Sequence, residues 1–150
     1  MISDQYLAGI IDGEGYITIK TRSPKQKYRE LVIGVSNTYL PLLEQLKEQF
    51  GGYISKSKMY KTNKKQGYHW IIKSVDRADM ILRRVRPFLI IKAERADLAL
   101  KFLDQKKANR HLIGLKLPDS FYEMERSIRD QMVRLNARNN HILPLMDQPQ

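Results

Sequence analysis

The sequence contains no cysteine and only three histidines, His69, His111 and His141. Disulfide bonds and thiolate metal sites are therefore excluded, and histidines so far apart along the chain predict no zinc site. Zinc-finger and HNH-type nuclease interpretations lose their support for the same reason. The absence of cysteine leaves the redox compartment open.

Long apolar runs are also missing. Apolar residues make up 42% of the chain, as in soluble globular proteins, but no stretch approaches the roughly 18 apolar residues of a membrane span. The N-terminal MISDQY lacks the basic start and apolar core of a secretory signal. We therefore expect no membrane partner and no secretion, and we place the protein inside the cell, in a prokaryotic cytoplasm or an organelle matrix.

Negative charge is scarce relative to positive charge. The chain has 27 lysines and arginines against 16 acids, which gives a net charge of +11. Nucleic acid is the commonest partner of so basic a protein, because each neutralised phosphate releases condensed counterions. Ribosomal and membrane-surface proteins carry similar charge, so this excess alone says nothing about catalysis.

The 150 residues suit a single domain, which we assign to residues 1–138, with a loosely ordered tail at 139–150. Apolar spacing predicts a first helix around residues 7–11 with Ser3 or Asp4 as N-cap, and alternation predicts strands at 16–22 and 28–36. The later predictions are a helix at 40–50, strands at 53–60 and 68–73, and helices beginning near Asp76 as N-cap, at 92–105, and at 120–138 with a Ser120–Glu123 capping box. This order indicates an α+β fold whose four-stranded antiparallel sheet leaves one polar, basic face open to duplex DNA.

The segment LAGIIDGEG at residues 7–15 carries two features that matter for function. Gly9 and Gly13 lie four residues apart, a spacing that lets two helix backbones approach closely, within the chain or between subunits. Glu14 follows at the negative end of the helix dipole, where an acid is disfavoured. If two such helices pair, their Glu14 carboxylates become neighbours and repel unless a cation lies between them. Mg²⁺ prefers such oxygen ligands and supports hydrolysis of a phosphodiester.

Spacing alone favours an ordinary capped helix with a surface acid. However, these nine residues resemble the signature of the LAGLIDADG homing endonucleases almost position for position, and the similarity extends in outline to about Phe102. The resemblance implies an αββαββα fold with a saddle-shaped sheet and C-terminal helices. It also implies intron homing by Mg²⁺-dependent cleavage of both strands of a long pseudo-palindromic double-stranded DNA target, with Mn²⁺ as a possible substitute and no small-molecule cofactor. Because one motif is present, it implies a homodimer. An intron RNA maturase and a non-catalytic DNA-binding regulator remain alternatives on the same scaffold.

The resemblance also assigns roles to single residues. Glu14 matches the metal-binding acid and the Gly13 carbonyl a second metal contact, although this chain has Glu and Gly where the consensus has Asp and Ala. Asn37 matches a polar residue that positions water, although it could equally be a helix cap. Lys92 matches a catalytic lysine, although it could be one more surface lysine. Asp12 matches a residue that supports the helix ends and is not counted as catalytic.

Two further surfaces follow from the same interpretation. The predicted dimer interface consists of Leu7, Gly9, Ile10 and Gly13. Alternation along the strands places one set of side chains on the face that reads DNA, and lysines near the second hairpin turn are expected to contact phosphates. The predicted DNA-binding residues are Tyr16, Thr18, Lys20, Arg22, Tyr28, Glu30, Ser55, Ser57, Lys58, His69 and Lys73.

Overall fold

A computed structural model of the chain describes residues 1–21, 23, 25, 27–62, 64–112 and 114–137. Arg22 and the predicted tail at 139–150 therefore lie outside the described residues. The described strands form one antiparallel sheet in the order β1-β2-β4-β3. Its strands are β1 (Gly15–Thr21), β2 (Arg29–Asn37), β3 (Tyr53–Lys56) and β4 (Tyr68–Ile72).

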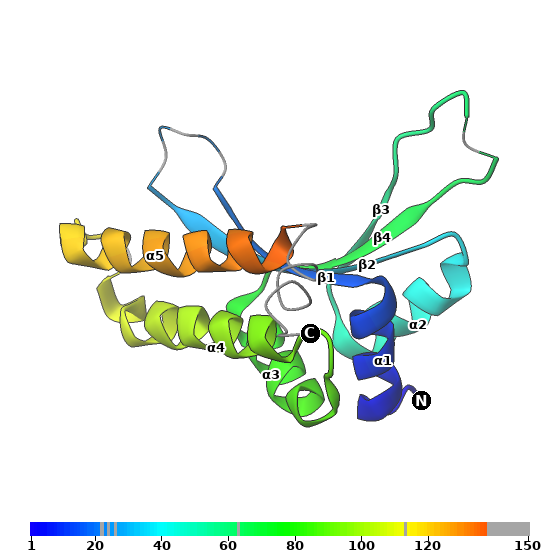
Figure 1. Ribbon diagram of the computed structural model, residues 1–150, viewed down its shortest axis with the longest axis horizontal. Coiled ribbons are helices and arrows are strands. Elements are labelled where there is room, and N and C mark those ends of the chain that lie inside the picture. Colours follow the sequence, from blue (N-terminus) through cyan, green and yellow to red (C-terminus); the bar gives the residue numbers. More distant parts are fainter. Residues whose placement is uncertain (22, 24, 26, 63, 113, 138–150) are drawn as a thin grey trace, which may run out of the picture.

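Helices pack beneath this sheet, and the two hairpins β1-β2 and β3-β4 rise from it and diverge like the sides of a saddle (Figure 1). The last helix runs beside the β1-β2 arm and above α4. The helices are α1 (Asp4–Glu14), α2 (Leu40–Phe50), α3 (Val75–Val85), α4 (Ala93–Ala108) and α5 (Asp119–Asn136), with short 3-10 turns η1 (Arg86–Phe88) and η2 (Arg110–Leu112). This arrangement confirms the predicted α+β fold, αββαββα followed by further helices.

Local signals set most helix ends where the sequence predicted them. The Ser3 hydroxyl accepts a hydrogen bond from the Tyr6 amide, as an N-cap does. Gly51 ends α2 in a left-handed conformation with φ 79°, which glycine adopts without a Cβ penalty.

Two predicted caps were wrong. Ser74, in extended conformation two residues before Asp76, is the N-cap of α3 and accepts from the Arg77 amide, which leaves Asp76 in the first turn. Extended Pro118 precedes α5, whose N-terminus has no side-chain cap, so no capping box forms there. The helix thus begins one residue before Ser120.

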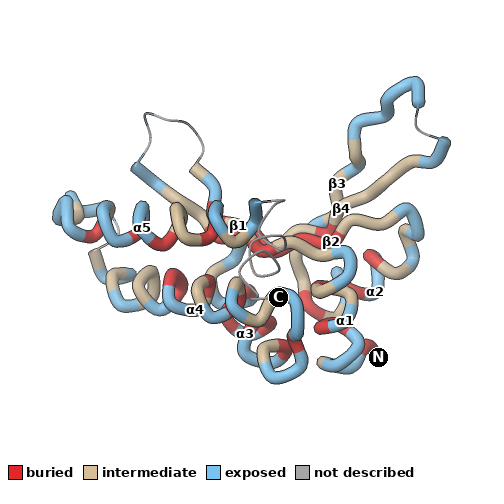
Figure 2. Tube along the Cα trace, in the orientation of Figure 1, coloured by how far each residue is buried: buried red, intermediate tan, exposed pale blue. Residues whose placement is uncertain are grey.

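The core lies between the sheet and the helices, where buried positions concentrate (Figure 2). Ile33, Trp70 and Ile72 are fully buried there, and the Trp70 indole donates to the Gly51 carbonyl over 2.8 Å. Alternation along β2 predicts Val32 and Gly34 on the open face with Glu30, yet Val32 is 1% exposed. Gly34 on the same strand is buried as well.

The burial of Gly34 has a clear cause. The Tyr16 ring lies across it, and a Cβ at Gly34 would meet the Tyr16 Cζ at 2.2 Å. The centre of the open face is therefore partly filled by the protein's own side chains.

Polar contacts hold α5 against the rest of the domain. The Asn136 amide donates to the Ile17 carbonyl on the outer edge of β1 over 3.0 Å, and Arg29 donates to the Tyr122 carbonyl over 3.3 Å. Lys106 of α4 reaches the buried Glu125 carboxylate over 2.8 Å. No helix in the described part of the chain is long and apolar enough to cross a membrane.

Candidate active site and nucleic-acid interface

Glu14 is the last residue of α1 and is exposed to solvent. The chain turns from this helix directly into β1, and Gly15 makes the turn possible, since a Cβ there would come within 2.7 Å of the Ile11 Cα. The last turn of α1 contains no basic residue, so no lysine or arginine of the helix offsets its negative end. The helix itself therefore supplies no positive charge to Glu14 or to its own last carbonyls.

Asn37, at the end of β2, holds the Glu14 side chain in place. Its Nδ2 donates to the Glu14 Oε2 over 2.5 Å, and its Oδ1 accepts from the Tyr39 amide over 2.8 Å. The bond to Tyr39 fixes which end of the Asn37 amide faces Glu14. The sequence left a helix cap and a site residue as alternatives, whereas Asn37 here binds both a backbone amide and the candidate metal ligand.

Asp12 and Lys92 join the end of α1 to the segment that follows η1. The Asp12 carboxylate accepts from the backbone amides of Ile90, Ile91 and Lys92 at 2.7, 3.2 and 2.9 Å. In return, the Lys92 ammonium donates to the Asp12 carbonyl over 2.6 Å. Asp12 thus anchors the segment that carries Lys92, and Lys92 covers a carbonyl at the negative end of the helix.

Lys92 is half-buried. Burial lowers its pKa below the ordinary lysine value; the nearby Asp12 charge opposes this shift, and the Arg95 charge adds to it. Arg95 also donates to the Ile91 carbonyl over 3.0 Å and to the Asn136 Oδ1 over 2.8 Å. Arg95 therefore links the Lys92 segment to the end of α5, a contact for which the residue pattern carries no signal.

One face of α1 has open space beside it within the described part of the protomer. Gly9 and Gly13 are exposed, and a Cβ added at either would meet no atom within 4 Å. Ile10 beside them is half-buried. Leu7, by contrast, is fully buried in the core of the protomer. Its inclusion in the predicted interface was wrong, because a side chain enclosed in the core cannot contact a second subunit.

The open face of the sheet carries most of the residues predicted to read DNA. Strand register aligns Tyr16 of β1 with Gly34 of β2, Gly34 with Ile71 of β4, and Ile71 with Tyr53 of β3. Burial raises the pKa of the Tyr16 phenol, and the neighbouring Tyr53 adds to this rise while a nearby lysine opposes it. Tyr53 was not predicted, although it shares the alternation of Ser55 and could have been found from it.

The outer part of this face is more polar. Thr18 pairs with Val32, and exposed Lys20 pairs with Glu30. Lys73 forms a 3.1 Å ion pair with Glu30, and its pKa is raised, first by the hydrogen bond to Glu30. The predicted DNA-binding residues Glu30 and Lys73 therefore bind each other in the free protein.

Tyr28 does not belong to the open face. Its ring centre lies 4.4 Å from the Lys106 ammonium of α4. Together with Phe121 and Tyr122 it lines a cavity of about 310 Å³ between α4 and α5. Its position just before β2 leaves it outside the alternating register on which the prediction rests.

His69 of β4 joins β2 to the segment that follows β3. Its Nδ1 lies 2.7 Å from the Ser36 hydroxyl of β2, and its Nε2 lies 2.7 Å from the hydroxyl of Ser57, just beyond β3. Ser55 is aligned with His69 in the register. Lys58 follows at the exposed start of the loop. Ser36 was not predicted, because it lies next to Asn37 at the strand end and its pairing with His69 depends on register.

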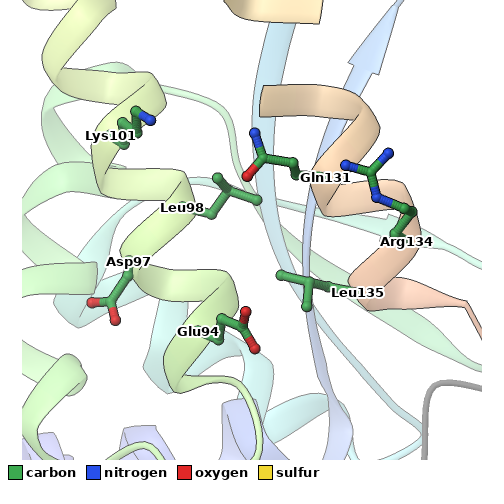
Figure 3. Close-up of a pocket in the computed structure, with 7 residues that line it drawn as sticks. All are labelled: Glu94, Asp97, Leu98, Lys101, Gln131, Arg134 and Leu135. Carbon is green, nitrogen blue, oxygen red and sulfur yellow. The ribbon is translucent and has the colours of Figure 1, made fainter. Parts of the chain in front are cut away.

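A separate groove of about 440 Å³ lies between α4 and α5 (Figure 3). Glu94 and Asp97 line it from α4, and Arg134 lines it from α5. Asp97 is already bound by two nitrogens of the Arg86 guanidinium at 2.6 and 2.8 Å. The groove is lined by no residue of α1 or of the sheet and is distinct from the Glu14 site.

Within the described residues, no cluster of three or more His, Asp or Glu side chains could hold a metal. The end of α1 in one protomer thus offers the exposed Glu14 carboxylate next to main-chain carbonyls. This donor set fits Mg²⁺, which keeps several waters and binds through one or two carboxylates and substrate phosphates. It does not fit zinc, whose protein sites use three or four ligands, mostly cysteine and histidine.

Comparison with known proteins agrees with this geometry. Residues 7–109 match the family model described as LAGLIDADG endonuclease. No curated protein sequence matches the chain. Among solved structures, the archaeal intron-encoded homing endonuclease I-Vdi141I, complexed with DNA, matches with a TM-score of 0.72 at 15% identity, covering 96% of this chain and 94% of that one.

Two further structures have the same fold. The homing endonuclease I-CvuI, in a DNA complex with Mg, has a TM-score of 0.70 at 15% identity and covers 98% of this chain and 96% of its own. I-SmaMI, bound to an uncleaved DNA target with calcium, has a TM-score of 0.69 at 21% identity; all of this chain matches 51% of I-SmaMI, so it spans about half that protein. Because the family model covers residues 7–109, most of the chain and its motif helix included, the chain belongs to the LAGLIDADG endonuclease family.

Proposed function

We propose that this protein is a site-specific homing endonuclease that hydrolyses both strands of a long, nearly palindromic DNA target as a metal-dependent homodimer. One observation carries the proposal: the Glu14 carboxylate is exposed at the negative end of α1 and oriented by Asn37. Beside it, the glycine face of the same helix has open space. The bond from Asn37 does not neutralise the charge of this acid, whereas a nearby cation would.

The destabilising effect of the two glycines on α1 supports the pairing of two subunits. Each helical glycine destabilises α1 by about 1 kcal/mol relative to alanine, and nothing in the described part of the protomer requires the missing Cβ atoms. Close contact between this helix and α1 of a second subunit would explain why both positions are glycine. Ile90 and Ile91, which Asp12 holds beside the end of α1, are 86% and 54% exposed and would extend such an interface with apolar surface.

The saddle is the proposed DNA-binding surface. Antiparallel strands fit the major groove of duplex DNA, and the basic charge of the chain, +11 overall, favours phosphate contact. Exposed lysines at 56, 58, 61, 64 and 65 flank the β3-β4 turn, where contact with phosphates would position the duplex without reading its sequence. The DNA complexes of I-Vdi141I and I-CvuI support this placement.

In the proposed reaction, the Glu14 carboxylate and the Gly13 carbonyl would hold Mg²⁺, which would supply Lewis-acid chemistry at the phosphate when bound. Asn37 restrains the Glu14 carboxylate by donating to its Oε2, which would leave Oε1 for the metal. Lys92 donates one ammonium proton to the Asp12 carbonyl, and its two remaining protons can stabilise charge on the phosphate. With two subunits, each strand of the duplex meets one such set.

The proposal is tested by selection from a library of randomised duplex DNA incubated with the protein and Mg²⁺. We expect enrichment of one long site whose two halves are related by a two-fold axis, cut on both strands. Failure to enrich any site, together with binding to an intron RNA, would make the chain a maturase. A specific site that is bound but never cut would make it a DNA-binding regulator.

A further inference from the structure

We propose that Ser36, His69 and Ser57 read bases as one coupled unit, called here the serine-histidine-serine unit, which presents one hydrogen-bond donor and one acceptor to the DNA. The proposal rests on the proposed function, since it assumes that the open face of the sheet meets the major groove. It adds a specific recognition chemistry to that face. The first support is geometric: both ring nitrogens of His69 lie 2.7 Å from a serine hydroxyl.

The backbone around the unit holds these positions firmly. Ser36 and His69 are aligned in the β2-β4 register. The Ser57 amide donates to the Gly67 carbonyl over 2.9 Å, and the Gln66 side chain donates to the carbonyls of both Ser57 and Gly67 at 2.9 and 2.8 Å. A Cβ at residue 67 would come within 3.0 Å of the Ser57 hydroxyl, so glycine at this position avoids a steric conflict with that hydroxyl.

The chemistry of a neutral imidazole makes the two serines unequal. One ring nitrogen carries a proton and donates, while the other accepts. The serine that accepts from the ring keeps its own proton free to donate outward. The serine that donates to the ring has only lone pairs left for an outside partner. The ring therefore links the two hydroxyls: fixing the role of one fixes the opposite role of the other.

Base edges in the major groove distinguish these roles. Guanine offers only acceptors there, whereas adenine and cytosine carry an amino group that donates. The hydroxyl that presents lone pairs will favour a base with an amino group, and the hydroxyl that presents its proton will favour guanine N7 or O6, adenine N7 or thymine O4. The unit thus recognises a donor group on one base and an acceptor atom on another, and the choice at one position depends on the choice at the other.

Ser55 provides a matched comparison. It is the same residue type on the same face and is aligned with His69, yet within the described part of the chain the ring nitrogens bind the hydroxyls of Ser36 and Ser57 instead. Replacing Ser55 removes a hydroxyl of equal size without breaking the link between Ser36 and Ser57. It therefore separates loss of a surface hydroxyl from loss of the coupling.

The experiment uses the full-length protein and the duplex that it selects from the random library, together with every single-base-pair variant of that duplex. Relative affinities are measured by competition for wild type, for the single variants Ser36→Ala, Ser55→Ala, Ser57→Ala and His69→Ala, and for the double variants Ser36→Ala/Ser57→Ala and Ser36→Ala/Ser55→Ala. Thermal melting confirms that each variant is folded. Should His69→Ala fail to fold, the serine variants alone decide the question.

We expect each of Ser36→Ala and Ser57→Ala to reduce discrimination by about 3- to 10-fold, the value of one neutral hydrogen bond. The loss should appear at two base pairs in each half-site, because freeing one serine releases the role of the other. The Ser36→Ala/Ser57→Ala pair should then lose less than the sum of its single changes, and Ser36→Ala/Ser55→Ala should be additive. Additive losses in both pairs, or unchanged discrimination, would overturn the coupled unit. Wild-type protein that selects no duplex would instead overturn the proposed function itself.

Discussion

Asn37 holds one oxygen of the Glu14 carboxylate and leaves the other available for a metal. A ligand held in this way loses little freedom when a metal binds, and partners that orient a metal ligand matter nearly as much as the ligand itself. The same amide also accepts from the Tyr39 backbone. The residue therefore has a small structural role and a larger proposed functional one.

We expect Asn37→Ala to lower the single-turnover cleavage rate by about 10- to 100-fold, as for other partners of metal ligands. Loss of the bond to Tyr39 should cost only about 0.5–2 kcal/mol of stability, the value of a capping contact. Rates are measured with excess protein on the selected duplex, and stability by urea unfolding. Thr38→Ala, at the exposed neighbouring position, is the control, and equal rates for both variants would argue against the role of Asn37.

The sequence predicted Glu14, Asn37 and Lys92 as site residues because each matched a motif. It could not predict the three amides that bind Asp12, since backbone donors leave no trace in residue identity. Nor could it predict the contact between Tyr16 and Gly34, which depends on strand register. Contacts between side chains of different strands cannot be predicted from a single sequence, because they depend on strand register.

At the scale of the helix, α1 has two faces with different tasks. Leu7 and Ile11 are fully buried in the protomer, while Gly9 and Gly13 leave open space. The glycines therefore lower the intrinsic stability of the helix, and no contact in the described part of the protomer offsets this loss.

Replacing both Gly9 and Gly13 with alanine should stabilise the isolated protomer by about 1 kcal/mol per site. Replacing both with leucine should separate the dimer, because the longer side chains keep the two helices apart. Sedimentation or light scattering measures the assembly, and urea unfolding measures the protomer. Gln45→Leu, on the exposed face of α2, is the control for added apolar surface, and a leucine variant that remains dimeric would refute this interface.

Asp79 of α3 pairs with Arg83 of the same helix at 3.2 Å and joins α3 to α4 through Lys107 at 2.8 Å. Burial alone would raise the pKa of this carboxyl, but the hydrogen bonds from Lys107 and Arg83 outweigh it and lower the pKa. A lowered pKa in the folded state means that the stabilisation is present above the unfolded pKa and is lost as the pH falls through the folded value.

Asp79→Asn should therefore lower the free energy of unfolding by about 1.5–3 kcal/mol at neutral pH, the value of hydrogen bonds to a charged group. The difference from wild type should shrink as the pH falls below the ordinary aspartate range. Urea unfolding across the pH series measures it. Asp104→Asn, which removes a 59% exposed partner of Arg83, should cost less than about 1 kcal/mol; an equal loss in both variants would contradict the assignment.

Element positions followed from the sequence because apolar periods of helix and strand differ, and Gly51 marked the end of α2 unambiguously. The N-cap at Ser74 was missed because the neighbouring Asp76 is an equally good cap residue, and α5 begins after Pro118 without the side-chain cap that the sequence predicted. Burial of Val32 was missed because alternation assumes an uncovered open face. Periodicity thus predicts an element better than it predicts the element's ends or what lies over it.

For the whole molecule, charge and shape act together. The chain has 27 basic and 16 acidic residues, and its two hairpins diverge to form a saddle. Lysines on the β3-β4 turn extend from one arm, where phosphates of a bound duplex would pass. Such contacts release counterions, so binding should weaken steeply as salt rises.

Changing three turn lysines to glutamine should make the dependence of log affinity on log salt shallower by about 0.9 for each phosphate that is no longer neutralised. Base discrimination should stay constant, since phosphate contacts position the duplex without reading it. Fluorescence titration over a salt series measures both. The variant changes Lys61, Lys64 and Lys65, and its control changes Lys47, Lys101 and Lys116, which are exposed away from the open face. An equal change of slope in both would show that net charge, not the arm, sets the salt dependence.

The central claim is that Glu14 acts in cleavage and not in DNA recognition. Glu14→Gln keeps the shape of the side chain but removes its charge, so cleavage of the selected duplex with Mg²⁺ should fall on the order of 10³-fold or more, as expected for loss of several kcal/mol of metal assistance. Affinity for the same duplex should change little, and Glu48→Gln on α2 should behave as wild type. A Glu14→Gln protein that cuts at the wild-type rate would contradict the account.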